Sequence, residues 1–203
     1  MNTLIYVTDP LCSWCYGFAK EITKITQHFE KEAPLKLIMG GLRPFNTQTM
    51  PELKDFLREH WDHVNQRSGQ PFNYKILNSP KFVYDTEPPA RAVIAMRLIQ
   101  PDLELAFFKA VQKAFYLGNK DTNQIAAYLP IVEKLGINTS LFEKTFLAES
   151  TKVLTTNDFQ RAKALGVRGF PTLLLQQDAT YSLICNGYAS AEQIIPFITS
   201  EMI

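Results

Sequence analysis

The stretch Asp9-Pro10-Leu11-Cys12-Ser13-Trp14-Cys15 lies between a strand-like segment and a helix-like one. Residues 3–7 before it are rich in β-branched and aromatic side chains, and after it apolar residues recur at helical spacing until Pro34. This order predicts a strand, then a turn in which Asp9-Pro10 ends the strand, then an amphipathic helix that opens at the cysteines.

The spacing of the two cysteines predicts thiol–disulfide exchange. Two cysteines three positions apart on a helix lie on one face, close enough to form a small disulfide ring. Cys12 falls at the exposed start of the helix, where free backbone N–H groups and the helix dipole stabilise an anion. We therefore expect its pKa to lie below the ~8.5 of a free cysteine. Cys12 is the predicted nucleophile, and Cys15, in the apolar stripe that faces the core, is the predicted resolving thiol.

Two other uses of a Cys-X-X-Cys pair fit this chain less well. A structural zinc ion usually takes four ligands, but no second pair is present and Cys185 stands alone. A purely structural disulfide within the pair would close too short a loop to restrict the unfolded chain much. We therefore expect no metal and no organic cofactor, only the redox-active pair.

A second signal lies far downstream, at Gly166-Val167-Arg168-Gly169-Phe170-Pro171-Thr172. A helical pattern over 154–165 precedes it, Gly166 suits a helix C-terminal cap, and the strand-like residues 172–175 overlap its end. Together with the cysteine stretch and the long helical segment between them, this pattern resembles the thioredoxin superfamily and, within it, the DsbA-like branch. The resemblance covers nearly the whole chain.

The resemblance implies an α/β thioredoxin fold, in which a β-α-β half and a β-β-α half surround a central mixed sheet and a large α-helical subdomain is inserted between them. It also implies a cis Phe170–Pro171 bond beside the cysteine pair, with the backbone of Phe170 offered to an extended substrate. Beside the catalytic Cys12 and Cys15, the substrate-binding residues that we expect are Ser13, Trp14, Phe170 and Pro171.

The residues around the cysteines resemble one group within the branch. Trp14 before the second cysteine and Asp9-Pro10 before the first are similar to the FrnE-like group of predicted protein-disulfide isomerases. The dipeptide Ser13-Trp14 differs from the Pro-His of periplasmic DsbA, so no histidine is present to stabilise the Cys12 thiolate. We expect a less oxidising couple than that of DsbA.

The order of the elements indicates a single domain over residues 1–203, with thioredoxin-fold halves at about 1–45 and 166–203 and a helical insertion at about 46–165. Asp121 or Thr122 is the expected N-cap of one inserted helix. The other expected elements are a strand over 35–39, helices over 51–64, 90–99, 103–115 and 141–146, a hairpin of 172–176 with 181–185, and a last helix from Ser190 to about 203.

Composition and charge limit the partners. The 203 residues are 46% hydrophobic, enough for a sizeable core, and 21 basic against 20 acidic residues give no electrostatic reason to bind nucleic acid or an anionic membrane. No span approaches the ~20 apolar residues of a membrane helix. Met1 is followed almost at once by the first strand, which leaves no signal peptide and predicts a cytoplasmic protein. The expected partners are proteins that carry thiols or disulfides, with glutathione as a further candidate.

Several other residues have two interpretations. Cys185, in an apolar strand, is interpreted as a small core side chain rather than a third redox thiol. His60 and His63 are interpreted as part of a solvated helix face rather than a metal site. Phe82 and Tyr84 either line an apolar groove beside the cysteines or belong to the core.

The predicted reaction is attack of Cys12 on a substrate disulfide, through a mixed disulfide that Cys15 resolves. The sequence leaves open whether the protein acts as an oxidase, an isomerase or a reductase. Two other classes also stay open. One is a non-catalytic DsbA-like adaptor that presents clients to a protease, for which Cys12 would be dispensable. The other is a glutathione-dependent transferase or isomerase of the kappa-class type, although those proteins have a serine where Cys12 stands.

Overall fold

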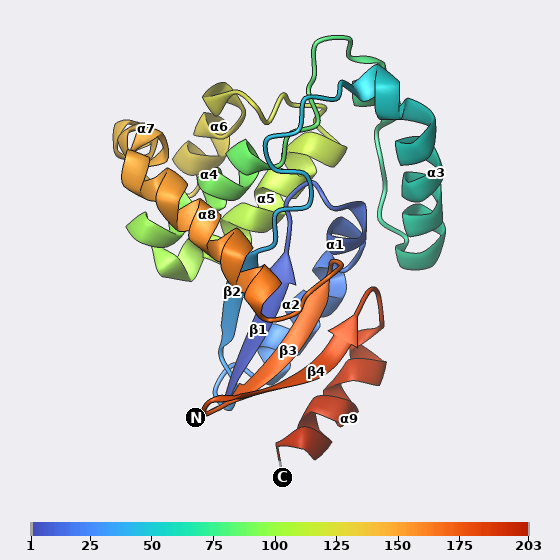
Figure 1. The fold of residues 1–203 in the computed structure, drawn as a ribbon, viewed down its shortest axis with the longest axis vertical. Coiled ribbons are helices and arrows are strands. Elements are labelled where there is room, and N and C mark those ends of the chain that lie inside the picture. Colours follow the sequence, from blue (N-terminus) through green and yellow to red (C-terminus); the bar gives the residue numbers. More distant parts are fainter. Residues whose placement is uncertain (1, 203) are drawn as a thin grey trace.

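The computed structural model describes residues 2–202, which form a four-stranded mixed sheet in the order β2-β1-β3-β4 (Figure 1). β1 pairs in parallel with β2, while β3 is antiparallel to both β1 and β4. Two helices join β1 to β2, and one helix follows β4, so the predicted thioredoxin fold is confirmed. The elements of these two halves are β1 (Asn2–Thr8), α1 (Ser13–Gly17), α2 (Ala19–His28), β2 (Leu35–Met39), β3 (Thr172–Gln177), β4 (Thr180–Asn186) and α9 (Ala191–Glu201).

The chain between β2 and β3 is helical, as the resemblance implies. Figure 1 shows α4 to α7 gathered beyond one end of the sheet, α8 running from them down to β2, and α3 standing apart near α1. Short 3-10 turns at Tyr74–Asn78, Pro101–Leu103 and Ile125–Ala127 connect some of them. The inserted helices are α3 (Met50–Ser68), α4 (Glu87–Ile99), α5 (Glu104–Tyr116), α6 (Leu129–Lys134), α7 (Thr139–Leu147) and α8 (Glu149–Ala164).

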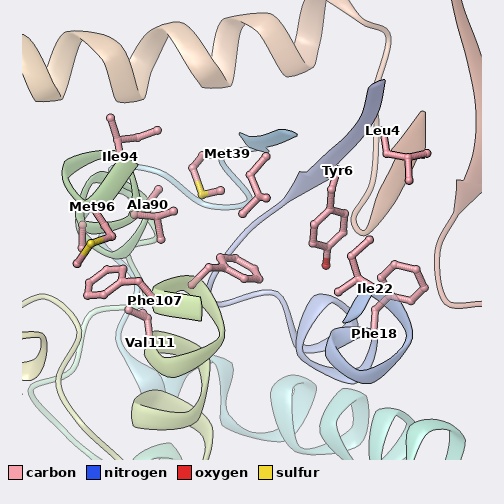
Figure 2. Close-up of a cluster of buried hydrophobic side chains, with 14 of the residues drawn as sticks. Leu4, Tyr6, Phe18, Ile22, Met39, Ala90, Ile94, Met96, Phe107 and Val111 are labelled. Carbon is pink, nitrogen blue, oxygen red and sulfur yellow. The ribbon is translucent and has the colours of Figure 1, made fainter. Parts of the chain in front are cut away.

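Alternation along β1 divides the core between the two faces of the sheet. Leu4 and Tyr6 pack on the face toward Phe18 and Ile22, and this cluster continues into α4 and α5 (Figure 2). Ile5, on the opposite face, belongs to a smaller cluster that includes Ala162 of α8. The sheet is therefore covered on both faces, and its carboxyl end, where β1 runs into Cys12, lies beneath the inserted helices.

A second, aromatic core joins α1 to the insertion. Tyr16 stacks on Tyr116 of α5 with ring centroids 4.6 Å apart, and Trp61 of α3 packs on Phe72 at 5.3 Å. Trp61 is fully buried. Burial of large aromatic side chains is the main stabilising contribution of such a cluster. This aromatic core holds the insertion against α1, the helix that begins at the cysteines.

Two expected helices differ from the sequence prediction. The helix that opens at the cysteines is divided at Phe18 into α1 and α2. A Cβ at Gly17 would come within 2.7 Å of the side chain of Val64 in α3, so the close packing of α3 on α1 requires glycine at this position. The helix expected to start at Asp121 or Thr122 begins only at Leu129. Asp121 instead accepts the N–H of Asn123 in a turn.

Candidate active site

The N-terminus of α1 brings the two sequence motifs together. Cys12 is the N-cap of the helix, with extended backbone angles, and its Sγ accepts the backbone N–H of Cys15 at 3.4 Å. The Cys12 thiol in turn donates to the carbonyl oxygen of Phe170 at 3.6 Å, across 158 residues of sequence. The Phe170–Pro171 bond is cis, as the resemblance implies. A helix N-terminus and a carbonyl from the other half of the fold therefore meet at one sulfur.

Cys12 is more enclosed than its position at a helix start predicts. It is only 5% exposed, and all three cysteines are free thiols in this structure. Burial raises the pKa of the Cys12 thiol well above its ordinary value, and the charge of Cys15 raises it further, while the N–H of Cys15 opposes the rise. The expectations of an exposed sulfur and a lowered pKa are therefore wrong for the unliganded protein. In this structure the Cys12 thiol donates to the carbonyl of Phe170.

The loop before Cys12 is held by groups from the insertion. The carbonyl oxygen of Leu11 accepts hydrogen bonds from the hydroxyls of both Tyr84 and Tyr116, the latter at 2.6 Å. The carboxylate of Asp9 accepts the N–H of Leu11 at 2.9 Å and that of Leu42 at 2.8 Å. These bonds fix the position of the nucleophile relative to the segments that surround it.

Two buried titratable groups lie beside the cysteines. Burial raises the pKa of Asp9 to about 6, although the hydrogen bonds from the N–H groups of Leu42 and Leu11 lower it. Burial also raises the pKa of Tyr6, and the neighbouring Cys15 adds to that rise. The charge of Asp9 contributes to the raised pKa of Cys12. Neither Asp9, which the sequence places at a turn, nor Tyr6, which it places in a strand, was expected at the site.

A hollow of about 190 Å³ opens beside the nucleophile. Phe56 is 48% exposed and Leu42 38%, so its walls are partly apolar surface that faces solvent. The residues that line it are Cys12, Ser13, Trp14, Leu42, Arg43, Phe56, Leu57, His60, Tyr84 and Phe170.

A second hollow, of about 370 Å³, lies on the other side of Trp14 and Phe170, which line both. Arg67, Gly187 and Tyr188 complete its walls, and the guanidinium of Arg67 lies 5.9 Å from the centre of the Tyr188 ring. No aspartate or glutamate lines either hollow, among residues 2–202. The walls of the two hollows are therefore apolar and basic, and the acidic Asp9 lies behind them.

The structure brings most of the expected substrate-binding residues together. Ser13, Trp14 and Phe170 line the hollows. Pro171 lines neither; it is buried, and its carbonyl oxygen accepts the N–H of Gly187 at 2.8 Å. Pro171 therefore lies behind the residues that line the two hollows.

Several residues around the cysteines carry no signal in the sequence. Arg43, Phe56 and Arg67 come from the insertion or its approach, and only the folded chain places them at the site. His60 is partly exposed and His63 exposed, in line with the solvated helix face, and His60 also lines the first hollow, with its ring 4.1 Å from that of Phe56. The residues that line the site therefore come from several segments outside the two motifs.

The other residues with two interpretations are resolved by burial. Phe82 and Tyr84 are each only 2% exposed and belong to the aromatic core, although Tyr84 also borders the first hollow. The Cys185 thiol donates to the carbonyl of Gly187 at 2.9 Å and packs at the edge of the main core. Over the part of the chain that the structure covers, no three histidine, cysteine or acidic side chains gather as metal ligands. No helix there is long and apolar enough to cross a bilayer.

Comparison with known structures reveals close relatives of this fold. A candidate protein disulfide isomerase from Nitrosomonas europaea is 36% identical, with a TM-score of 0.92 over 98% of this chain and 96% of that one. The cytosolic disulfide reductase DsbM from Pseudomonas aeruginosa, also solved with GSH, is 24% identical, with a TM-score of 0.82 over 98% of both chains. The oxidoreductase DsbA from Xylella fastidiosa is 12% identical, with a TM-score of 0.65 over 98% of this chain and 85% of that one.

A comparison with curated proteins gives no match. The family model described as thioredoxin matches residues 5–192, which include both motifs and the whole insertion. With this match and the identity to the Nitrosomonas protein, the chain belongs to the thioredoxin family, and its fold is that of the DsbA-like oxidoreductases.

Proposed function

We propose that this protein catalyses thiol–disulfide exchange through Cys12 and Cys15, with glutathione as its small-molecule redox partner. The observation that carries the proposal is the position of Cys12 Sγ, which lies between the N–H of Cys15 and the carbonyl of Phe170 at the border of a hollow. A sulfur so placed has a donor ready to stabilise its thiolate, a second thiol one helical turn away and room for a substrate on one side.

Each step of the proposed reaction exchanges one sulfur–sulfur bond for another. The Cys12 thiolate attacks a substrate disulfide, forms a mixed disulfide and releases the first substrate thiolate. Cys15, once deprotonated, attacks Cys12 Sγ, forms the Cys12–Cys15 disulfide and releases the second substrate thiolate. Two molecules of reduced glutathione then restore both thiols and leave as glutathione disulfide. The substrate gains the two electrons that glutathione loses.

The charges of the site support glutathione as the partner. Glutathione carries two carboxylates besides its thiol, and Arg43 and Arg67 lie in the two hollows that flank Trp14 and Phe170. Charge-assisted bonds between arginine and carboxylate are among the stronger polar interactions in proteins. The similarity to DsbM, which has been solved with GSH, is a second support.

The site also has features suited to a protein substrate. Leu42, Phe45 and Phe56 are 38%, 65% and 48% exposed, and two of them border the hollow at Cys12. Such surface would hold apolar side chains next to a substrate disulfide. We propose an isomerase or reductase of the FrnE-like group that works in the cytoplasm, in line with the similarity to a cytosolic reductase and to a candidate isomerase.

The experiment that tests the proposal is a redox titration of the Cys12–Cys15 pair against glutathione, followed by mass spectrometry in a Cys185→Ala background. We expect a reversible two-electron couple within or just above the cytosolic range of ~−320 to −220 mV. A couple well above that range would mean an oxidase. The absence of any reversible couple would overturn the proposal and favour the adaptor, in which Cys12→Ser keeps full function.

A further inference from the structure

A third cavity, of about 330 Å³, lies behind α1 and is separate from the two hollows at Cys12, with which it shares no lining residue. It is formed where the beginning of α2, one face of α5 and the segment after α3 meet. Its walls are made by Tyr16, Ala19, Lys20, Thr23, Gln70, Lys109, Gln112 and Lys113.

The charges on its walls are all of one sign. Lys20, Lys109 and Lys113 line the cavity, and no aspartate or glutamate does so. Among residues 2–202, none of these three lysines has a carboxylate within 4.0 Å. In a chain with 21 basic and 20 acidic residues, three lysines around one cavity without an acidic partner form a local excess of positive charge.

Lys109 is the least hydrated of the three. It is half-buried, and its ammonium donates to the hydroxyl of Thr23 at 3.0 Å. Burial lowers its pKa, and the neighbouring charge of Lys113 lowers it further. Both effects disfavour the empty, positively charged state, and an anion between the two ammonium groups would relieve both.

Gln112 provides the second observation. This side chain is fully buried, and neither its amide oxygen nor its amide nitrogen has a hydrogen-bond partner among the described residues. The other amide on the cavity wall is engaged, because Gln70 donates to the carbonyl of Tyr16 at 3.1 Å. A buried amide without partners is unfavourable, and its terminal torsion is soft, so a small rotation would turn its N–H₂ toward a ligand.

We propose that this cavity is a binding site for a small organic oxyanion, whose carboxylate or phosphate oxygens contact Lys109, Lys113 and the amide of Gln112. The apolar part of such a ligand would lie against Ala19 and the ring of Tyr16. Tyr16 directly follows Cys15 in α1, and its hydroxyl donates to the carbonyl of Pro71 at 3.0 Å. The site is therefore one layer behind the reactive thiols and does not depend on the proposed function.

Isothermal titration of the whole protein with pyrophosphate and, separately, with citrate tests the proposal, at constant ionic strength. We expect at least one probe to bind, with a Kd raised at least tenfold in Lys109→Met and in Gln112→Glu. Lys163→Met, which removes an exposed lysine of α8, is the matched control and should bind like the wild type. Binding of pyrophosphate alone would assign a phosphate ligand, and binding of citrate alone a carboxylate.

Two further readouts keep the test independent of folding. If Lys109→Met does not fold, as judged by circular dichroism, Lys113→Met at a more exposed position takes its place. In the wild-type protein, the side-chain N–H₂ resonances of Gln112 should shift as the probe is added. No binding of either probe, or equal binding by all variants with no shift of the Gln112 resonances, would overturn the proposal.

Discussion

The ring of Phe170 occupies the space that a side chain at Gly40 would need. A Cβ built on Gly40 would lie 2.8 Å from Cδ1 of that ring and nearer still to Cε1 and Cζ. Gly40 directly follows β2, and its N–H donates to the carbonyl of Thr8 at 2.7 Å. The absence of a side chain at this strand end therefore lets Phe170, whose carbonyl accepts the Cys12 thiol, reach the site.

Gly40→Ala should accordingly damage the site through Phe170. The new methyl group must displace an aromatic ring that lines both hollows, so we expect kcat/KM for exchange to fall by about tenfold or more, with a stability loss of about 1–3 kcal/mol. Gly169→Ala is the matched control, because its Cβ would meet only Asn186, at 3.7 Å. Turnover of a fluorescent disulfide peptide measures both, and equal losses in the two variants would contradict this role of Gly40.

The two cysteines of the site should have different mutant phenotypes. Cys12→Ser should abolish exchange, because no other sulfur lies at the N-cap position of α1. Cys15→Ser should still form the mixed disulfide but fail to resolve it, so that covalent adducts with substrate or glutathione accumulate. Intact-protein mass spectrometry after incubation with glutathione disulfide detects the adduct. Adducts on Cys12→Ser but not on Cys15→Ser would reverse the assignment.

Asp9 should make stability fall as the pH rises through the mildly acidic range. The ordinary pKa of this carboxyl is 3.8, and in the folded protein it is about 6, so between these values the native state binds more protons than the unfolded one. The free energy of unfolding should drop by about 2 kcal/mol from pH 4 to pH 6.5 on this account. Asp9→Asn should lack this component, whereas Asp55→Asn, an exposed residue of α3, should keep it. Urea denaturation at several pH values provides the measurement.

Asp9→Asn should also change the pKa and the reactivity of Cys12. The charge of Asp9 helps to raise the pKa of Cys12, so Asp9→Asn should lower that pKa. Alkylation of Cys12 by iodoacetamide at pH 7, in a Cys185→Ala background, should then be faster than in the parent. A slower reaction would mean that Asp9 acts mainly as a proton acceptor for the thiol.

The two tyrosines that bond to Leu11 should not behave independently. Tyr84→Phe or Tyr116→Phe each leaves one hydroxyl on the Leu11 carbonyl, so each should cost only about 1 kcal/mol of stability. The double variant leaves a buried carbonyl without either bond and should cost more than the sum of the single variants. Chemical denaturation of the four proteins in this cycle measures the coupling. Additive losses would show that the two hydroxyls act independently and would contradict this coupling.

Substitution of two aromatic residues on successive turns of α3 should have different effects, one on substrate binding and the other on stability. Phe56 is 48% exposed and lines the hollow at Cys12, so Phe56→Ala should raise KM for a disulfide peptide several-fold and change stability by less than about 0.5 kcal/mol. Trp61 is fully buried in the aromatic core, so Trp61→Ala should cost about 3–5 kcal/mol. Unfolding midpoints and initial rates, measured on both variants, test the contrast.

Local signals made much of the fold predictable. The strand over 35–39 has the predicted bounds, and Ser190 begins α9 with a capping box to Gln193. Pro88-Pro89 fall in the first turn of α4, where proline costs nothing in hydrogen bonding. Where an acidic residue can make either a cap or a turn, as Asp121 can, the sequence does not distinguish the two.

The candidate site was less predictable than the fold, for physical reasons. Helix capping acts over short distances in the chain and identifies Cys12 and Cys15, whereas Phe170 was expected only from the resemblance of its motif to the DsbA-like branch. Arg67 and Tyr84 reach the site only through the docking of α3 and its neighbours, which depends on packing across the aromatic core. The prediction of a lowered pKa for Cys12 was wrong for the same reason, because the residues that bury Cys12 are far from it in the sequence.

The contact between Cys12 and Phe170 spans 158 residues, and this distance matters during synthesis. Ribosomes release Cys12 long before Phe170, so a growing chain presents this sulfur without its carbonyl acceptor and without the walls that later enclose it. Free in solvent, the nascent thiol titrates as an ordinary cysteine and is open to cellular oxidants. Translation of the last two strands therefore does more than complete a sheet: it changes an unprotected cysteine into a sheltered one.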